Sequence, residues 1–169
     1  PPLDLAICVL TWGAPRTLEH TLNSYERNGV LACARERLLF VQERAADAPE
    51  AAIAHRWGFT LIGDPENVGI GPAFLALCRA ASAELVLFLE DDWVCVEPPG
   101  RVRALLDEAA GFIAGGEAHV VRLRSRRQPG EPLYSRCMEG REAMVDGMHL
   151  LDCVHWRDEP DALFPGKIA

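Results

Sequence analysis

The chain has 169 residues and a formal net charge of −8 at pH 7. With 49% hydrophobic residues it is too apolar for a disordered chain, and its length suits one folded domain with a real core. Its apolar runs, such as Leu85 to Leu89, are far shorter than the ~20 residues that a membrane-spanning helix needs.

Of the 17 basic residues only one is a lysine, Lys167. Ile168 follows the Gly166–Lys167 pair, so the chain lacks a P-loop, which requires Ser or Thr at that place. A Schiff-base enzyme would have to use this same lysine near the end of the chain, which we do not expect. The acidic balance also disfavours a nucleic-acid binder, because such proteins neutralise phosphates with basic side chains.

Short apolar runs alternate with amphipathic segments. The apolar runs predict buried strands at Leu5–Leu10, Leu38–Gln42, Phe59–Ile62 and Leu85–Leu89. Helical spacing and stop signals predict four helices. The first carries Leu18, Leu22 and Tyr25 and ends at Asn28–Gly29, and the second runs from Pro49 to Trp57. The third has Pro72 in its first turn and runs to about Ser82, and the fourth runs from about Arg101 to Ala114. The alternation predicts an α/β fold with a mostly parallel sheet and helices on both of its faces.

The pattern weakens in the last third of the chain. A further strand is predicted at His119–Arg124, and loops follow from Gln128, with one short strand near Met148–Cys153. We find no internal repeat and no low-complexity tract. The chain is therefore expected to form one domain.

Three carboxylates, Glu90, Asp91 and Asp92, directly follow the last strong strand. Ligands of open α/β sheets bind at the carboxyl ends of strands, so these side chains are expected to lie at such an edge and to repel one another. A hard divalent cation relieves this repulsion, commonly with a substrate diphosphate completing its shell. We therefore predict a Mn²⁺ or Mg²⁺ site; an acidic strand end facing solvent is the simpler alternative.

Asn67, Gly69 and Gly71 form a second candidate site after the third strand. Glycines let the backbone approach a ligand, and the following helix offers free amides at its N-terminus. The third glycine of the dinucleotide fingerprint is missing, which disfavours a Rossmann dehydrogenase. On its own this pattern is more often a structural turn.

The motifs occur in a recognisable order: Thr-x-x-x-Pro-Arg from Thr11 to Arg16, Glu-Asn-x-Gly-x-Gly-x-Ala from Glu66 to Ala73, and Leu-Phe-Leu-Glu-Asp-Asp from Leu87 to Asp92. Over roughly residues 5–99 the chain resembles the nucleotide-sugar half of GT-A fold glycosyltransferases, most closely the large family 2. The stretch from Leu87 to Asp92 is similar to the Asp-x-Asp motif of that fold. Some Golgi N-acetylglucosaminyltransferases have a Glu-Asp-Asp version.

The resemblance implies roles for the three acids. Asp92 would bind the Mn²⁺ or Mg²⁺ ion that bridges the donor diphosphate, and Asp91 would lie near the ribose and the metal. Glu90 would lie near the nucleoside.

Five further residues receive donor-binding roles from the resemblance. Thr11 would line the base pocket through its backbone, and Glu43 would replace the aspartate that reads the uracil ring. Asn67 and Gly69 would shape the wall on the base side. Arg16 is the counterpart of an arginine that family members often carry in the first loop.

By the same resemblance, residues 3–99 form the nucleotide-sugar half and residues 100–169 begin the acceptor half. An inverting transferase also needs a carboxylate base for the acceptor hydroxyl. Six downstream acids are candidates for this base, and none lies in a recognisable motif: Glu139, Glu142, Asp146, Asp152, Asp158 and Glu159. We expect the base beyond Ala169, and we expect the chain to be a segment of a longer protein.

The resemblance thus implies a metal-dependent hexosyl- or N-acetylhexosaminyltransferase. It would move a sugar from a nucleotide-diphosphate donor, a UDP-sugar, to a hydroxyl of a glycan, lipid or protein, with inversion. A non-catalytic GT-A-like binding module is one alternative. A sugar nucleotidyltransferase is another, although Thr11–Arg16 lacks the basic, glycine-rich loop usual in that class. Without a visible targeting signal, the compartment stays open between cytoplasm and Golgi lumen.

Overall fold

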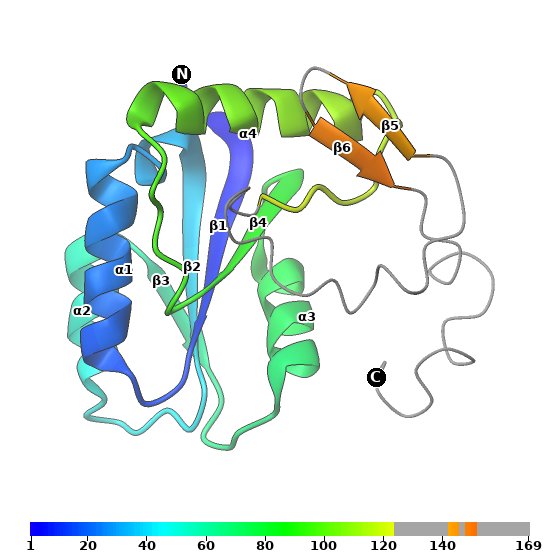
Figure 1. Cartoon of the computed structure of the whole chain (residues 1–169). Coiled ribbons are helices and arrows are strands. Elements are labelled where there is room, and N and C mark those ends of the chain that lie inside the picture. Colours follow the sequence, from blue (N-terminus) through cyan, green and yellow to red (C-terminus); the bar gives the residue numbers. More distant parts are fainter. Residues whose placement is uncertain (124–141, 146–147, 152–169) are drawn as a thin grey trace. The chain divides into compact units, whose positions relative to one another are not determined.

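The computed structural model describes residues 1–123, 142–145 and 148–151 (Figure 1). Its strands are β1 (Leu3–Thr11), β2 (Ala34–Val41), β3 (Thr60–Gly63), β4 (Leu85–Glu90), β5 (Glu142–Val145) and β6 (Met148–Leu151). Its helices are α1 (Pro15–Arg27), α2 (Pro49–Trp57), α3 (Ile70–Ala80) and α4 (Pro99–Ala114), with a 3-10 turn at Leu31–Cys33.

Strands β1 to β4 form one parallel sheet in the order β3-β2-β1-β4. β1 pairs with β2 on one side and β4 on the other, so that Leu10 lies opposite both Phe40 and Glu90. The chain runs outward from β1 to β3 and then crosses to the other side of β1. The strand order therefore reverses between β1 and β4, and the carboxyl ends of strands at such a reversal form the usual ligand crevice of open α/β sheets.

Helices cover both faces of the sheet, as predicted: α1 and α2 lie against one face and α3 against the other (Figure 1). β1 alternates between the two faces. Ile7 and Val9 pack in the cluster that contains Leu22 of α1, whereas Cys8 packs in the cluster that contains Leu77 of α3. A strand buried on both faces requires the continuous apolar run that the sequence shows.

The predicted helix starts and stops are largely confirmed by local geometry. α1 and α2 begin at Pro15 and Pro49, whose fixed φ suits a first helical position. α2 ends at Gly58, which has a φ of 69° in the left-handed region. α3 begins at Ile70, so that Pro72 lies in its first turn, as predicted.

β2 begins at Ala34, four residues before the predicted start at Leu38. The added residues include Glu36, whose carboxylate accepts a hydrogen bond of 2.8 Å from the amide of Ser82, and Arg37, which donates to the carbonyl of Trp57 at 2.8 Å. Charged side chains hid this part of the strand, because the prediction relied on an unbroken apolar run.

The strand predicted at His119–Arg124 is wrong in its described part. Residues 119–123 have no regular structure, and Val120 and Leu123 are 76% and 42% exposed. A polar-apolar alternation forms a strand only where a neighbouring strand and a packed face support it. Arg124 lies outside the described residues.

The short strand expected near Met148–Cys153 is present as β6, which ends at Leu151. It pairs antiparallel with β5, which the sequence did not predict. Four-residue strands carry too little periodicity for a pattern-based prediction.

The chain forms two compact units, Pro1–Gly111 and Phe112–Ala169. The four-stranded sheet belongs to the first unit and the β5–β6 pair to the second. The predicted boundary between a nucleotide-sugar half at 3–99 and an acceptor half at 100–169 stays a prediction. In the described part of the chain, no helix is both long enough and apolar enough to cross a membrane.

Candidate functional site

Four chain segments meet at the carboxyl edge of the parallel sheet. They are Thr11–Trp12 after β1, Gln42–Glu43 after β2, Asp64–Gly69 after β3 and Glu90–Asp92 at the end of β4. The sheet's hydrogen bonding continues into them. The Gln42 amide donates to the Thr11 carbonyl at 3.0 Å, and the Asp91 amide donates to the Leu10 carbonyl at 3.1 Å. This edge adjoins the strand-order reversal described above.

The side chain of Asp91 is held against β1. The hydroxyl of Thr11, which is fully buried, donates to Asp91 Oδ2 at 2.5 Å. The backbone amide of Trp12 points at the same oxygen at 3.4 Å. Both contacts use Oδ2, and within the described residues Oδ1 has no hydrogen-bond or ion-pair partner. Asp91 is thus oriented by the protein while one of its oxygens stays available.

The other two acids carry uncompensated charge. Burial raises the pKa of the Glu90 carboxyl, and the neighbouring charges of Asp92 and then Asp91 raise it further. Asp92 is exposed. No described residue forms a hydrogen bond or ion pair with the side chain of Glu90 or Asp92. The end of β4 is therefore a concentration of negative charge that a cation would stabilise.

The residues at this edge fit a metal ion only when a bound substrate supplies part of its coordination shell. The described residues contain no cluster of three or more His, Cys, Asp or Glu side chains arranged to hold an ion. Mg²⁺ is commonly bound by one or two carboxylates, with substrate phosphates and water completing its shell. The free oxygen of Asp91 and the carboxylate of Asp92 suit that arrangement, in which a phosphorylated substrate supplies further ligands.

Trp12 and Glu43 form a bridge between the loops after β1 and β2. The indole Nε1–H of Trp12 donates to Glu43 Oε2 at 3.0 Å. Glu43 is the one described non-glycine residue with positive φ, 51°, a conformation that costs about 1 kcal/mol or more and is often found at functional sites. If Glu43 reads a base ring as predicted, it does so with a carboxylate of which one oxygen already accepts a hydrogen bond from Trp12.

Gln42 anchors the loop after β3. Its side chain is buried, and its amide group donates to the Gly69 carbonyl at 2.9 Å and accepts from the Val68 amide at 3.0 Å. Asn67 Oδ1 in turn accepts from the Gly69 amide at 3.0 Å, and Gly69 has a φ of 81°. The structure thus brings Asn67 and Gly69 beside the end of β2. Their predicted role in the wall of a base pocket stays a prediction. Gln42 was not predicted as a site residue, although a polar residue that ends an apolar run is a usable signal.

Helix α1 holds the segment that follows the three acids. The Tyr25 hydroxyl donates to the Trp93 carbonyl at 2.6 Å. Ser24 Oγ accepts from the Cys95 amide at 3.0 Å, and the Asn28 amide group donates to the Cys95 carbonyl at 2.8 Å. Burial raises the pKa of Tyr25, so its hydroxyl remains a donor at physiological pH. These three polar residues fix the path of the chain beyond Asp92, and sequence periodicity identified only Tyr25, as a core residue.

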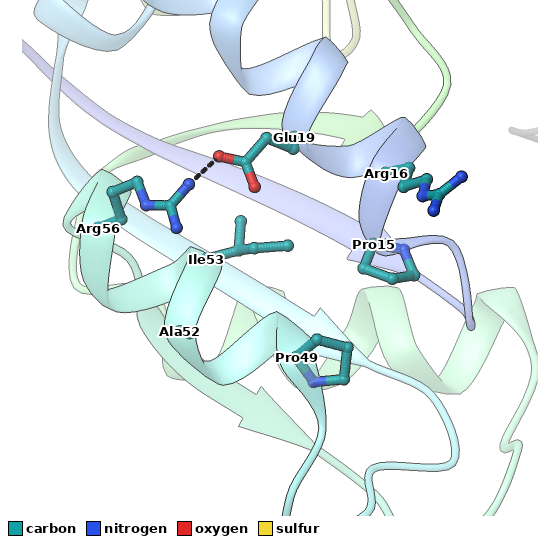
Figure 2. A pocket seen from close by; sticks show the side chains of 7 residues that line it. All are labelled: Pro15, Arg16, Glu19, Pro49, Ala52, Ile53 and Arg56. Atoms are coloured by element: carbon teal, nitrogen blue, oxygen red, sulfur yellow. Dashed lines mark hydrogen bonds and ion pairs between the residues drawn. The ribbon is translucent and has the colours of Figure 1, made fainter.

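Arg16 lies apart from this acidic edge. It lines a groove of about 420 Å³ between α1 and α2, together with Pro15, Pro49 and the ion pair of Glu19 with Arg56 (Figure 2). No described hydrogen bond or ion pair joins Arg16 to the acids. Its predicted donor-binding role stays a prediction.

The candidate catalytic bases fall almost wholly outside the described residues. Glu142 begins β5. The others, Glu139, Asp146, Asp152, Asp158 and Glu159, lie outside the described ranges.

The parallel sheet with its reversal between β1 and β4, covered by helices on both faces, is the GT-A fold, the class that the motifs indicated. Solved structures support this assignment. S. aureus TarS 1–349 matches with a TM-score of 0.56 and 16% identity, over 83% of this chain and 41% of that one. Further structures of the same TarS segment hold UDP-GlcNAc or UDP.

A second neighbour is the mannosyltransferase PcManGT from Pyrobaculum calidifontis, in complex with GDP-Man and Mn²⁺. It matches with a TM-score of 0.51 and 20% identity, over 68% of this chain and 33% of that one. The chain therefore spans less than half the length of either neighbour. No protein-family model and no curated protein matches the chain in sequence. At these identities the likeness shows the fold.

Proposed function

We propose that this chain binds a nucleoside-diphosphate sugar together with a divalent cation and forms the donor half of a glycosyltransferase. The observation that carries the proposal is the arrangement of Asp91 and Asp92. One oxygen of Asp91 is held by Thr11 and Trp12, while its other oxygen and the Asp92 carboxylate are free at the ligand edge of the sheet. The ligands named for the two neighbours, UDP-GlcNAc and GDP-Man with Mn²⁺, support it.

The chemistry explains why free carboxylates are useful here. Transfer of the sugar releases a nucleoside diphosphate, and the charge that develops on it must be compensated. A divalent cation held by Asp91 and Asp92 would supply that compensation. The chain's own residues orient the site: Thr11 and Trp12 fix Asp91, and α1 fixes the segment beyond Asp92 through Tyr25.

The donor and the reaction are further parts of the proposal. A UDP-sugar is the donor implied by the family resemblance, and a GDP-sugar is the donor held by one neighbour. The acceptor is a hydroxyl of a glycan, lipid or protein, and transfer proceeds with inversion. The carboxylate base that inversion requires would come from outside the described donor half.

Calorimetric titration of UDP and of GDP, each with and without Mn²⁺, tests the proposal. We expect Mn²⁺ to lower the Kd of at least one nucleotide by about tenfold or more. A tenfold change corresponds to ~1.4 kcal/mol of binding free energy. Asp92→Asn keeps the size of the side chain, removes its charge and should abolish most of this gain.

Asp107→Asn is the matched control, because Asp107 is an exposed aspartate of α4 whose partner is Arg103 in the preceding turn. This variant should behave as the unaltered chain. Nucleotide binding that ignores Mn²⁺, or an Asp92→Asn variant that keeps the Mn²⁺ effect, would contradict the proposed metal role.

A further inference from the structure

Asp91 and Asp92 are the two middle residues of a turn that follows β4. The Trp93 amide donates to the Glu90 carbonyl at 3.2 Å and so closes this turn. On its first side the turn is joined to β1, because the Asp91 amide donates to the Leu10 carbonyl at 3.1 Å. β1 therefore fixes the side of the turn on which the first of the two aspartates lies.

Asp92 lacks a side-chain anchor of its own. Its side chain is exposed and has no hydrogen-bond or ion-pair partner among the described residues, whereas Asp91 is held by the Thr11 hydroxyl. The position of the Asp92 carboxylate therefore depends on the backbone that carries it. That backbone is held by β1 before Asp92, and its other side depends on the contacts of the residues that follow.

Helix α1 supplies the anchor on that other side, beginning with Tyr25. The Tyr25 hydroxyl donates to the carbonyl of Trp93, the residue after Asp92, at 2.6 Å. The Tyr25 side chain is only 1% exposed and packs in the core cluster that contains Leu22, so the hydroxyl has little freedom to move. This bond fixes the last residue of the acidic turn.

Two further side chains, Ser24 in α1 and Asn28 at its C-terminal cap, bind both backbone polar groups of Cys95. The Ser24 hydroxyl donates to the Thr21 carbonyl at 2.7 Å, and its oxygen accepts from the Cys95 amide at 3.0 Å. The Asn28 amide group donates to the Cys95 carbonyl at 2.8 Å. Together with Tyr25, these residues hold the chain after Asp92 against the helix.

We propose that Tyr25, Ser24 and Asn28 are positioning residues that place the Asp92 carboxylate for the divalent cation. They act through the backbone of Trp93 and Cys95 rather than by contact with a ligand. This inference rests on the proposed function. A metal site needs its ligands within roughly 0.5 Å of the productive geometry, so loosening the chain after Asp92 weakens the binding of the cation more than that of the nucleotide.

Nucleotide titrations with and without Mn²⁺ separate this role from a general loss of structure, using whichever of UDP and GDP binds the unaltered chain more tightly. Tyr25→Phe, Ser24→Ala and Asn28→Ala each remove one of the three bonds. Each variant should reduce the gain in nucleotide affinity that Mn²⁺ brings by roughly fivefold, the effect of one lost hydrogen bond. Nucleotide binding without Mn²⁺ should stay unchanged. Electron paramagnetic resonance of free Mn²⁺ at saturating nucleotide should show the same loss directly.

Asn23→Ala is the matched control. Asn23 is an exposed asparagine of the same helix, and its amide group donates to the Glu19 carbonyl at 2.9 Å rather than to the chain after Asp92. This variant should keep the full Mn²⁺ effect.

Two results would overturn the positioning role alone: an unchanged Mn²⁺ effect in the three variants, or a loss of affinity that is equal with and without Mn²⁺. If Mn²⁺ has no effect on the unaltered chain, the proposed function fails and this inference fails with it. Asn28→Ala keeps the test decisive even if Tyr25→Phe does not fold, because Asn28 is half-buried at the end of the helix and lies outside the core clusters.

Discussion

Thr11 and Thr21 show how differently two buried hydroxyls can act. Both side chains are fully buried, but the Thr11 hydroxyl donates to Asp91 whereas the Thr21 hydroxyl has no partner among the described residues. A buried hydroxyl that binds a carboxylate orients it, and one without a partner only adds a desolvation cost. Comparing variants of the two residues therefore distinguishes the orientation of Asp91 by Thr11 from the general effect of changing a buried threonine.

Replacing Thr11 with Val should reduce Mn²⁺-dependent nucleotide binding by about tenfold, because Asp91 loses the stronger of its two donors. The free energy of unfolding should fall by about 1.5 kcal/mol, the low end for a hydrogen bond to a charged group. Titration calorimetry and urea unfolding measure the two effects.

Thr21→Val is the matched variant in α1. It should leave nucleotide binding unchanged and should not lower stability, since it removes an unpaired buried hydroxyl. Equal losses of binding in the two variants would show that Thr11 contributes only packing.

The residues of the candidate site were predictable from sequence to different degrees. Asp91 and Asp92 stand out because acids directly after an apolar strand have little structural reason to be there. The roles of Ser24 and Asn28 were not predictable, because each binds the backbone of Cys95, more than 60 residues away along the chain. Long-range contacts of this kind leave no local pattern.

At the scale of elements, the loop after β3 depends on the end of β2. The Gln42 side chain links them through bonds to the Val68 amide and the Gly69 carbonyl. Backbone bonds, such as that from the Arg44 amide to the Asp64 carbonyl at 2.8 Å, add to this link. This link places the start of α3, whose first residue follows Gly69, beside the site. A buried polar side chain thus sets the position of a whole element.

Gln42→Met should loosen this loop without removing the strand, because methionine fills similar space but cannot form either hydrogen bond. We expect the Val68 amide to exchange with deuterium at least about tenfold faster, and stability to fall by about 1–2 kcal/mol. The amide of Val9 in the centre of β1 serves as the internal reference. Unchanged exchange at Val68 would mean that other contacts hold the loop.

The elements themselves were mostly predictable, because their patterns are local. α2 was predicted to the residue from Pro49 and Gly58, whose backbone preferences fix a helix start and stop. The prediction of a strand at 119–124 was wrong because periodicity carries no information on whether a neighbouring strand exists. β2 begins earlier than predicted because its first residues include charged side chains, which interrupt the apolar pattern. One of them, Arg37, donates to the Trp57 carbonyl.

At the scale of the whole molecule, the sheet order determines where the site lies. Alternating strands and helices predicted a parallel sheet, but the order β3-β2-β1-β4 is a property of three-dimensional pairing. That order puts the ends of β1 and β4 side by side and so brings Thr11 to Asp91, 80 residues along the chain. Periodicity alone could not give this order, because the pairing of strands far apart in the sequence leaves no local pattern.

The central claim is that a nucleotide and a divalent cation bind together at the ends of β1 and β4. Paramagnetic broadening by Mn²⁺ in nuclear magnetic resonance spectra of the labelled chain tests it most directly, with GDP or UDP present. The amide signals of Thr11, Trp12, Asp91 and Asp92 should broaden only when nucleotide is added, and those of Arg35 and Glu36 at the opposite end of β2 should stay sharp. Broadening that needs no nucleotide, or that spares the ends of β1 and β4, would contradict the account.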